Sequence, residues 1–485
     1  MFIQTLFIAY YFPVSQTDIF FFCYSTITLA AWFVNSLDHS VIVPRSMRIR
    51  ERLGDTYAMN FLSYFLKINI ILGLFVTVIF FIYPVKLMSF LSGFSTYQIM
   101  DNIGLLYFMA PLFCLMTLVG LLNNILVSYR YFTMPSITSV ITSLIAIGCM
   151  FLFQERMGIS SVALGLTISF FLNAGGLIAL LYKQCGWHFH QSSRIFRLIK
   201  WKDLLYSQSG NIITFFSNYF PYYLLSGYPT GIVTALNYGQ KTSEMPTQLI
   251  VNQVSSVVAI KLNEIHSKKN HQEANATFIS SVGLLLFITI PISAISFFYA
   301  DTIISVLYAR GKFQQSVLNN SAYFFMVLIW LLPLVSINTL CARIFMSVGI
   351  IREAFYYQSI LNILSIILVT VFVKYFGYHA YPYAVVLVYT INIFTIKTLF
   401  DRYVTYIKYK MILSDFIRVL VINIPSCFVL WIIIVSMKLN PLLSLLTSGF
   451  IYVVILVMLN QVWVVNKDLA TLVSGVVKYV KNEKK

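Results

Sequence analysis

Residues 226–246 read SGYPTGIVTALNYGQKTSEMP, and this stretch decides how the rest of the chain is interpreted. It opens as a tight turn, because Gly227, Pro229 and Gly231 supply the backbone angles that a turn needs. It then continues into a segment that is otherwise apolar enough to enter a bilayer. Four polar side chains inside this segment share one face of the predicted helix, at spacing i, i+3, i+4 and i+7: Asn237, Gln240, Lys241 and Glu244.

Two interpretations of this polar face follow from its charges. Each charge at membrane depth costs about 2.5 kcal/mol or more, so such groups usually face a bundle interior or a wet cavity. In the first interpretation Lys241 and Glu244, three residues apart, only neutralise each other. In the second, the face is the polar wall of a substrate pathway, and Pro246, two residues after Glu244, is the hinge at which the helix bends.

The composition indicates an integral membrane protein. The chain has 485 residues, of which 59% are hydrophobic and only 10% are charged, whereas soluble domains are roughly 25% charged. The net charge is +17, and most basic residues lie in short loops between apolar spans. This pattern indicates membrane topology and contact with anionic membrane lipids, and it gives no support to a nucleic-acid partner. The six cysteines show no metal-binding spacing, and the cluster Cys185, His188, His190 lacks a fourth ligand, so we predict no metal site.

Apolar segments predict about 14 transmembrane helices, because a membrane helix requires ~20 residues. The first, at about 2–12, is short and stops before Pro13. The full spans are predicted at 17–40, 57–82, 99–127, 132–153, 159–182, 204–225, 231–260, 275–299, 316–347, 354–376, 380–400, 414–437 and 441–465. Basic residues concentrate in the even-numbered connections, so both termini are predicted to be cytoplasmic.

A weak internal repeat predicts two lobes in parallel orientation. Gly158 and Asn173 recur as Gly377 and Asn392, both 219 residues later. Six spans separate the copies, which is the arrangement of two-lobed transporters with the substrate path between the lobes. The predicted fold class is therefore an all-α polytopic membrane protein with two parallel-repeat lobes. The predicted domains are an N-terminal lobe (1–186), a basic cytoplasmic linker (187–203), a C-terminal lobe (204–404), two extra helices (405–465) and a basic amphipathic tail (466–485).

Several short motifs carry a resemblance to a known family. They are P-T-G-x-V-x-x-L-N-Y-x-x-x-x-x-E-x-P at 229–246, Y-A-R-G-K-F at 308–313, A-R-I-F at 342–345, Y-F with Pro135 at 131–135, and V-P at 43–44. In this order and spacing the chain resembles the MurJ (MviN) lipid II flippases of the multidrug/oligosaccharidyl-lipid/polysaccharide exporter superfamily, as a divergent member. The resemblance covers the chain from about Asp18 to the tail.

The chain departs from that family at several charged positions. The family's first helix carries an Arg-Asp pair, and here the first helix is about half as long, with no counterpart. Arginines of the second helix are replaced near Ala30 and Ala31, and the Asp-Arg pair of the eighth helix is Gln240-Lys241. Some members bind sodium with an acid of the seventh helix, and this seventh span has none beyond Asp203 at its edge. The sequence therefore does not identify a coupling ion.

The resemblance implies a flippase that moves a polyprenyl-pyrophosphate-linked glycan, such as a lipid II-like peptidoglycan precursor, across the bacterial cytoplasmic membrane by alternating access. The pyrophosphate needs cations and the sugars need amides or hydroxyls. Lys241 is the first candidate cation, Lys67 the second, and Arg45, with its neighbours Arg48, Arg50 and Arg52, a third at the inner surface. Asp18 and Asp38 could pair with cations across the pathway or sense protons, whereas the interpretation favoured for Asp38 beside His39 is a solvated pair at the membrane interface. The predicted substrate-binding residues are Lys241, Gln240, Asn237, Glu244, Lys67, Arg45 and Asp18.

Other functions stay open at this point. The chain could move an O-antigen or capsule intermediate, for which the replaced arginines argue, or be a degenerate scaffold without transport, as the short first helix suggests. A drug exporter of the same superfamily would have an acid-rich cavity, and an integral glycosyltransferase would have acid or His pairs in an outer loop. No Gly-rich phosphate loop, HExxH or GxSxG motif occurs. We therefore predict that the protein is not an enzyme, has no cofactor, and is a monomer.

Overall fold

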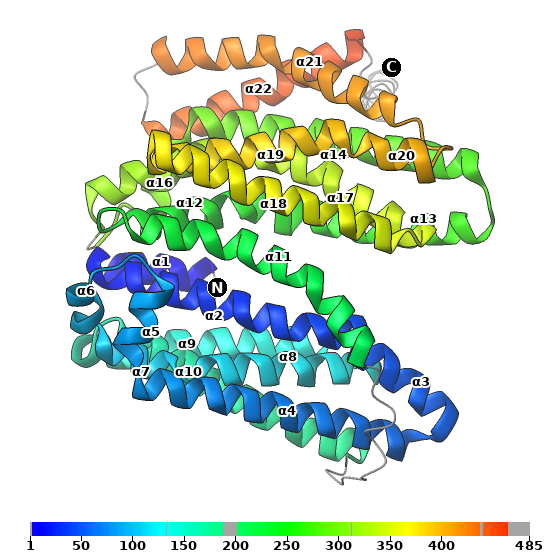
Figure 1. The fold of residues 1–485 in the computed structure, drawn as a ribbon. Coiled ribbons are helices and arrows are strands. Elements are labelled where there is room, and N and C mark those ends of the chain that lie inside the picture. Colours follow the sequence, from blue (N-terminus) through cyan, green and yellow to red (C-terminus); the bar gives the residue numbers. More distant parts are fainter. Residues whose placement is uncertain (1, 132, 188–200, 312, 437–439, 464–485) are drawn as a thin grey trace, which may run out of the picture. The chain divides into compact units, whose positions relative to one another are not determined.

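All regular elements in the described part of the chain are helices. The computed structural model describes residues 2–131, 133–187, 201–311, 313–436 and 440–463, and no strand occurs among them (Figure 1). Helix is the state in which an apolar chain satisfies its own backbone groups inside lipid. The predicted all-α membrane fold is therefore confirmed. Most of the predicted linker and all of the predicted amphipathic tail lie outside the described residues.

Eleven helices among the described residues are long and apolar enough to cross a membrane. They match eleven of the thirteen predicted full spans, with α17 (Leu331–Val348) forming the second half of the span predicted at 316–347. The remaining two predicted spans are also helical, namely α11 (Trp201–Ser226) and the helix that begins with α12 (Ile232–Pro246). The second of these carries the polar face singled out above, which explains its low hydropathy.

The chain forms two compact units, which we describe separately. Unit 1 comprises Met1–Thr234 with Arg310–Val317, and unit 2 comprises Ala235–Ala309 with Leu318–Lys485. Unit 1 therefore includes α11, which the sequence analysis assigns to the second lobe. The lobe boundary within 187–203 stays a prediction, because residues 188–200 are not described.

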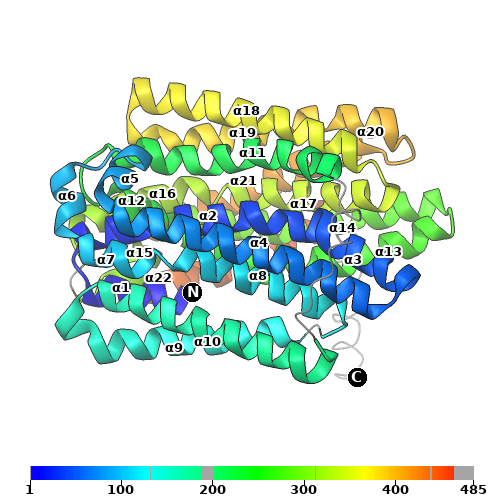
Figure 2. The same cartoon turned by 60° about the horizontal axis from the view of Figure 1, so that its bottom comes forward.

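Unit 1 is organised around α8, which packs against α2, α4 and α10, while α10 also packs along α9 (Figure 2). Its core is aliphatic and aromatic, with residues such as Leu62, Leu121 and Ile125 fully buried. Its helices are α1 (Phe2–Tyr11), α2 (Val14–Leu37), η1 (Asp38–Ile42), α3 (Val43–Leu53), α4 (Asp55–Ile82), α5 (Pro84–Leu91), α6 (Thr96–Asp101), α7 (Ile103–Met109), α8 (Leu112–Ser128), α9 (Met134–Met157), α10 (Ser160–Cys185) and α11.

Unit 2 is organised around α14, which packs against α17 and α21, while α21 packs against α22 (Figure 1). The elements after α12 are η3 (Thr247–Val251), α13 (Asn252–Ser267), α14 (His271–Phe298), α15 (Ala300–Tyr308), α16 (Gln315–Leu328), α17, α18 (Ile351–Phe376), η4 (Tyr378–Ala380), α19 (Tyr381–Thr395), α20 (Lys397–Tyr403), α21 (Tyr409–Ser436) and α22 (Pro441–Trp463).

The internal repeat is visible in the order and spacing of the helices. The starts of α2 and α12 lie 218 residues apart, at Val14 and Ile232, and those of the short helices α5 and α15 lie 216 apart. Gly158 and Gly377 end α9 and α18 with positive φ values of 54° and 77°. Asn173 donates a hydrogen bond from α10 to Thr142 on α9, and Asn392 on α19 accepts one from Tyr357 on α18. The helices therefore follow the order of the predicted repeat.

Candidate functional site

The first turn of α12 is held by a carboxylate that lies 213 residues earlier in the chain. Asp18 on α2 is buried, and its two carboxylate oxygens accept hydrogen bonds from the backbone N–H groups of Gly231 and Thr234, the latter at 2.7 Å. The hydroxyls of Thr17 and Thr234 are 3.0 Å apart. The N–H groups of a first helical turn have no partner within their own helix, and a negative charge there is favoured by the helix dipole. Asp18 therefore fastens the start of α12 to α2.

Gly231 is required at this turn for two separate reasons. Its φ of +106° lies in a region that residues with a Cβ rarely adopt. A Cβ at this position would also come within 2.8 Å of the Val317 side chain. Gly231 in the Pro-Thr-Gly sequence at 229–231 thus lets the backbone at the start of α12 lie close to neighbouring side chains.

One face of α12 is packed tightly in unit 2. Gly239 lies against α16, where a Cβ would meet the Cβ of Phe324 at 2.8 Å. The rings of Tyr238 and Tyr308 have centroids 4.6 Å apart, and the hydroxyls of Thr242 and Tyr308 are 3.2 Å apart. Because these contacts fix the rotation of α12 about its axis, they also determine which way the opposite face points.

The opposite face of α12 carries the predicted polar residues. Gln240, Lys241 and Glu244 are all partly exposed, while Asn237, one turn earlier, is buried. The side-chain amide of Gln240 donates a 2.8 Å hydrogen bond to Glu244, whereas the Lys241 ammonium lies 3.9 Å from the other carboxylate oxygen. That distance is beyond a charge-assisted hydrogen bond. Glu244 is thus bonded mainly to the amide, and Lys241 keeps donor capacity for an anion.

A further aromatic residue belongs to the surroundings of this face. The carboxylate of Glu244 lies within electrostatic range of Tyr389 on α19. The sequence analysis did not single out Tyr389, because one tyrosine among 32 gives no signal in the sequence. The structure therefore adds a hydroxyl from a second helix of unit 2 to the environment of Glu244.

The predicted hinge lies at an irregular point of the backbone. Pro246 is the last residue of α12, and the π-helical turn η3 follows directly before α13. Proline has no N–H, so it cannot bond to the carbonyl one turn earlier. A π turn also closes wider hydrogen-bonded rings than an α-helix and often marks a functional site. A bending motion here stays a prediction.

The remaining predicted residues lie in unit 1 and are not gathered at one place. Asp18 and Arg45 belong to one continuous helix, Val14–Leu53, and the rise per residue of a helix places them ~40 Å apart. Lys67 is exposed on α4, and Arg45 is partly exposed on α3. For these three residues substrate contact stays a prediction, and the bonds of Asp18 are those of a helix cap.

Arg50 has a contact network that the sequence did not reveal. Its guanidinium lies 3.2 Å from Asp55, donates a 3.1 Å hydrogen bond to the carbonyl of Ser128 at the end of α8, and stacks 3.6 Å above the ring of Tyr129. A cation at a helix C-terminus is favoured by the helix dipole. Arg50 therefore joins the α3–α4 turn to the end of α8. Neighbouring Arg48 and Arg52 are exposed.

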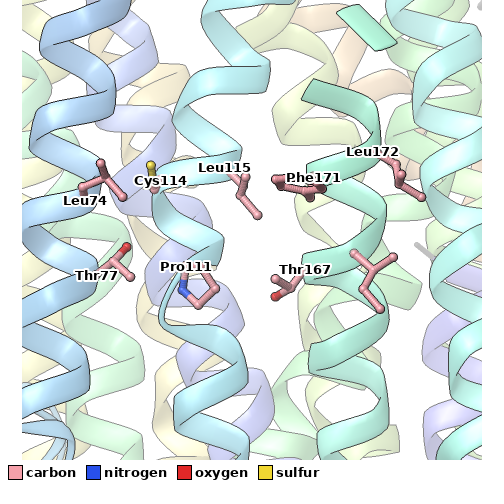
Figure 3. Close-up of a pocket in the computed structure, with 9 residues that line it drawn as sticks. Leu74, Thr77, Pro111, Cys114, Leu115, Thr167, Phe171 and Leu172 are labelled. Atoms are coloured by element: carbon pink, nitrogen blue, oxygen red, sulfur yellow. The ribbon is translucent and has the colours of Figure 1, made fainter. Parts of the chain in front are cut away.

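A cavity of about 380 Å³ opens in unit 1 among α4, α8 and α10 (Figure 3). Pro111 interrupts the helix between α7 and α8 at this level. The hydroxyl of Thr77 donates a 2.8 Å hydrogen bond to the carbonyl of Gly73, and that of Thr167 donates a 2.7 Å bond to the carbonyl of Phe108. These bonds satisfy the polar groups, so the cavity wall is apolar. It suits hydrocarbon and offers nothing to a phosphate or sugar.

Comparison with known proteins decides the family. The model of the family described as Lipid II flippase MurJ matches residues 8–451 of the 485. The chain belongs to this family. It is similar to the probable lipid II flippase MurJ of Borreliella burgdorferi, with 24% identity over 329 residues, which are 67% of this chain and 64% of that protein. The corresponding protein of Buchnera aphidicola subsp. Schizaphis graminum is 23% identical over 65% of this chain and 63% of its own length. The chain thus matches less than two thirds of the length of these relatives.

Solved structures agree with the MurJ family on the fold. The inward closed conformation of lipid II flippase MurJ matches with a TM-score of 0.78 at 18% identity, covering 95% of this chain and 96% of the other. An inward-facing multidrug resistance MATE transporter of the MOP superfamily matches with a TM-score of 0.65 at 14% identity, covering 80% and 90%. At these identities the likeness concerns the fold. The MurJ resemblance predicted from the sequence is confirmed.

Proposed function

We propose that this protein is a flippase that moves a polyprenyl-pyrophosphate-linked glycan, of the lipid II type, across the bacterial cytoplasmic membrane by alternating access. Membership of the MurJ family supports the substrate class. The polar face of α12 is the observation that carries the proposal. Lys241 supplies a cation, and Gln240 supplies an amide beside it on a helix whose other face is packed. In this role Lys241 binds the pyrophosphate as a point charge, and the partly exposed amide Gln240 binds sugar hydroxyls. Asn237 is buried, so its predicted contact with the sugars would require α12 to move during transport.

The surroundings of Lys241 favour reversible binding of the substrate's phosphate over tight, permanent binding. A cation that must release its anion benefits from a nearby carboxylate, because the competing charge limits affinity. The 3.9 Å separation from Glu244 leaves Lys241 able to bind and release a phosphate. Lys67 and Arg45 are proposed as further contacts of the headgroup in unit 1. The protein is proposed to act as a monomer, with its basic loops against anionic lipids and both termini in the cytoplasm.

The test is depletion of the protein in its host, followed by extraction of polyprenyl-linked intermediates from the inner leaflet. Lipid II is expected to accumulate on depletion. Accumulation of an O-antigen or capsule unit would change the assigned glycan, an alternative that the replacement of the family's second-helix arginines at Ala30 and Ala31 favours. No accumulation would overturn transport and favour a scaffold role.

Variants of Lys241 test whether the headgroup binds at the polar face of α12. Lys241→Ala is expected to fail to restore flipping, whereas Lys241→Arg is expected to restore it, because the cation is kept. The matched control is Lys261→Ala, since Lys261 is exposed on α13, further along the same helix. Wild-type flipping by Lys241→Ala at normal protein level would exclude this face as the headgroup site.

A further inference from the structure

Asp38 is a buried carboxylate in unit 1. It begins the π turn η1 inside the continuous helix Val14–Leu53 and is 1% exposed. The sequence analysis interpreted it as solvated and interfacial, and this interpretation is wrong. The physical reason is that the helix continues through α3, so that Asp38 is packed against α8 and α11 instead of ending a span. An ionised carboxylate buried without a partner is so costly that it usually acquires a proton or a counter-ion.

The immediate partners of Asp38 supply one hydrogen bond donor. The side-chain amide of Asn124 on α8 faces the carboxylate. The second carboxylate oxygen, Oδ2, is buried and has no hydrogen-bond partner among the residues that the structure describes. A carboxylate ordinarily accepts about four hydrogen bonds, so this one is under-satisfied.

Asn35 and Asn123, on the two helices that meet at Asp38, also have buried side-chain oxygens without donors. Asn35 precedes Asp38 by three residues and so lies on the same helix face. Its amide nitrogen donates weakly, at 3.5 Å, to the carbonyl of Met116 on α8. Within the described part of the chain nothing donates to its Oδ1, or to the Oδ1 of Asn123, the residue before Asn124. Three side-chain oxygens on two packed helices are therefore buried without a hydrogen-bond donor among the described residues.

The backbone of α8 makes room for this cluster. Gly120 lies against Asn35 so closely that an added Cβ would be 2.0 Å from the asparagine amide nitrogen. Any other residue at this position would displace the Asn35 side chain. The helix α8 itself carries no charged residue between Leu112 and Ser128. The cluster is thus held in place by close packing, and a charge on α8 does not neutralise it.

Charged groups on the other neighbouring elements do not pair with Asp38 in the described structure. The elements packed against η1 are α2, α3, α8 and α11. On α2, Asp18 lies twenty residues away, and His39, next to Asp38, is exposed. On α3 the charged residues begin seven positions later: Arg45, Arg48, Arg50, Glu51 and Arg52. On α11 the side chains of Lys202, Asp203 and Tyr206 lie outside what is described, and the remaining titratable residues are Tyr219, Tyr222 and Tyr223.

We propose that Asp38, Asn35, Asn123 and Asn124 form a site for a monovalent cation, Na⁺ or a proton, that drives the transport cycle. Carboxylate and amide oxygens are the ligands that hard cations take in proteins. A π turn suits such a site because it leaves backbone carbonyls less regularly bonded than an α-helix does. The driving role rests on the proposed flippase function, whereas cation binding itself does not.

Binding is tested on purified full-length protein without lipid-linked substrate. Thermal stability is measured with NaCl or choline chloride at constant ionic strength, and in choline chloride from pH 5 to pH 9. Asp38→Asn keeps the shape and removes the charge. Asp101→Asn is the matched control, since Asp101 is an exposed acid of unit 1. If Na⁺ is the cation, wild type and Asp101→Asn gain several degrees in Tm with Na⁺, saturably, and Asp38→Asn does not.

If the proton is the cation, wild type loses stability relative to Asp38→Asn as the pH rises, because the deprotonated carboxylate is buried without a counter-charge. Equal Na⁺ and pH responses of wild type and Asp38→Asn would overturn the proposal. Asn123→Ala provides a second variant. The Na⁺ or proton concentration that gives half of the change in Tm is expected to rise about tenfold in this variant, which corresponds to a loss of ~1.4 kcal/mol of binding free energy. If Asn123→Ala leaves this concentration unchanged while Asp38→Asn abolishes the change in Tm, Asn123 is not part of the site.

The driving role is tested by flipping in vesicles that carry a Na⁺ or pH gradient. Loss of gradient dependence in Asp38→Asn, with residual flipping retained, supports coupling. A gradient-dependent Asp38→Asn would overturn the coupling role even where binding is found. If no flipping occurs in any variant while the cation response is present, the flippase proposal fails and the cation site stands.

Discussion

The helix Val14–Leu53 and the helix formed by α12, η3 and α13 occupy equivalent positions in the internal repeat, yet their polar residues differ in kind. Both contain a π turn, η1 in the first and η3 in the second. In the first helix the carboxylates of Asp18 and Asp38 are buried. In the second, Lys241 and Glu244 are more than one third exposed. The first helix thus buries its carboxylates, whereas the second leaves its charged side chains partly exposed.

The largest effect is expected from Asp18→Ala, which removes the contact from α2 to the start of α12. Two backbone N–H groups lose a charged acceptor, and each such bond is worth about 1.5–3 kcal/mol. We expect a lower Tm in detergent and no complementation in cells. Asp18→Asn keeps one acceptor but turns an NH₂ group toward the other backbone N–H. Its Tm is therefore expected to lie between those of Asp18→Ala and wild type. A stable and active Asp18→Ala protein would show that α12 does not need this cap.

The next effect is expected from Pro246→Ala, which restores an N–H and favours a regular helix before η3. If the helix bends here during transport, flipping slows about tenfold, equivalent to ~1.4 kcal/mol in the barrier, while Tm stays equal or rises. The control is Pro425→Ala, because Pro425 lies inside the continuous helix α21. Equal rates for wild type and Pro246→Ala would remove the hinge assignment.

A smaller effect is expected from Arg50→Ala in unit 1. The variant loses the bond to Ser128 and the stacking on Tyr129, together about 1–3 kcal/mol. Thermal unfolding is expected to shift by a few degrees, and flipping by properly folded protein is expected to stay within about twofold of wild type. A large loss of flipping at full stability would instead assign Arg50 to the headgroup.

The smallest effect is expected from Glu244→Gln, which sharpens the contrast between the two helices. Removing the carboxylate leaves Lys241 without its weak ion pair, and exposed pairs of this kind are worth up to about 1 kcal/mol. The apparent affinity for the lipid-linked substrate is expected to rise two- to threefold, measured as the half-saturating substrate concentration. A complete loss of flipping would show that Glu244 contacts the substrate or the coupling cation directly.

The fold could be predicted largely from the sequence because apolar length and loop charge determine membrane helices directly. The polar face of α12 was also predictable, since its four residues follow helical spacing in an apolar context. The cap formed by Asp18 on Gly231 was not, because a bond across 213 residues leaves no periodic pattern. The burial of Asp38 was missed for a different reason. Its neighbours His39 and Arg45 are typical of a membrane boundary, and only packing shows that the helix continues.

The π turns η1 and η3 have a consequence for changes in chain length. A π turn closes i→i+5 bonds and therefore accommodates one residue more than an α turn does. Elsewhere in a spanning helix, the loss of one residue rotates all following side chains by about 100°, onto the wrong face. Within Asp38–Ile42 or Thr247–Val251 a single-residue deletion can instead convert the wide turn into a regular one. Natural gaps among related sequences are therefore expected to fall at these two places.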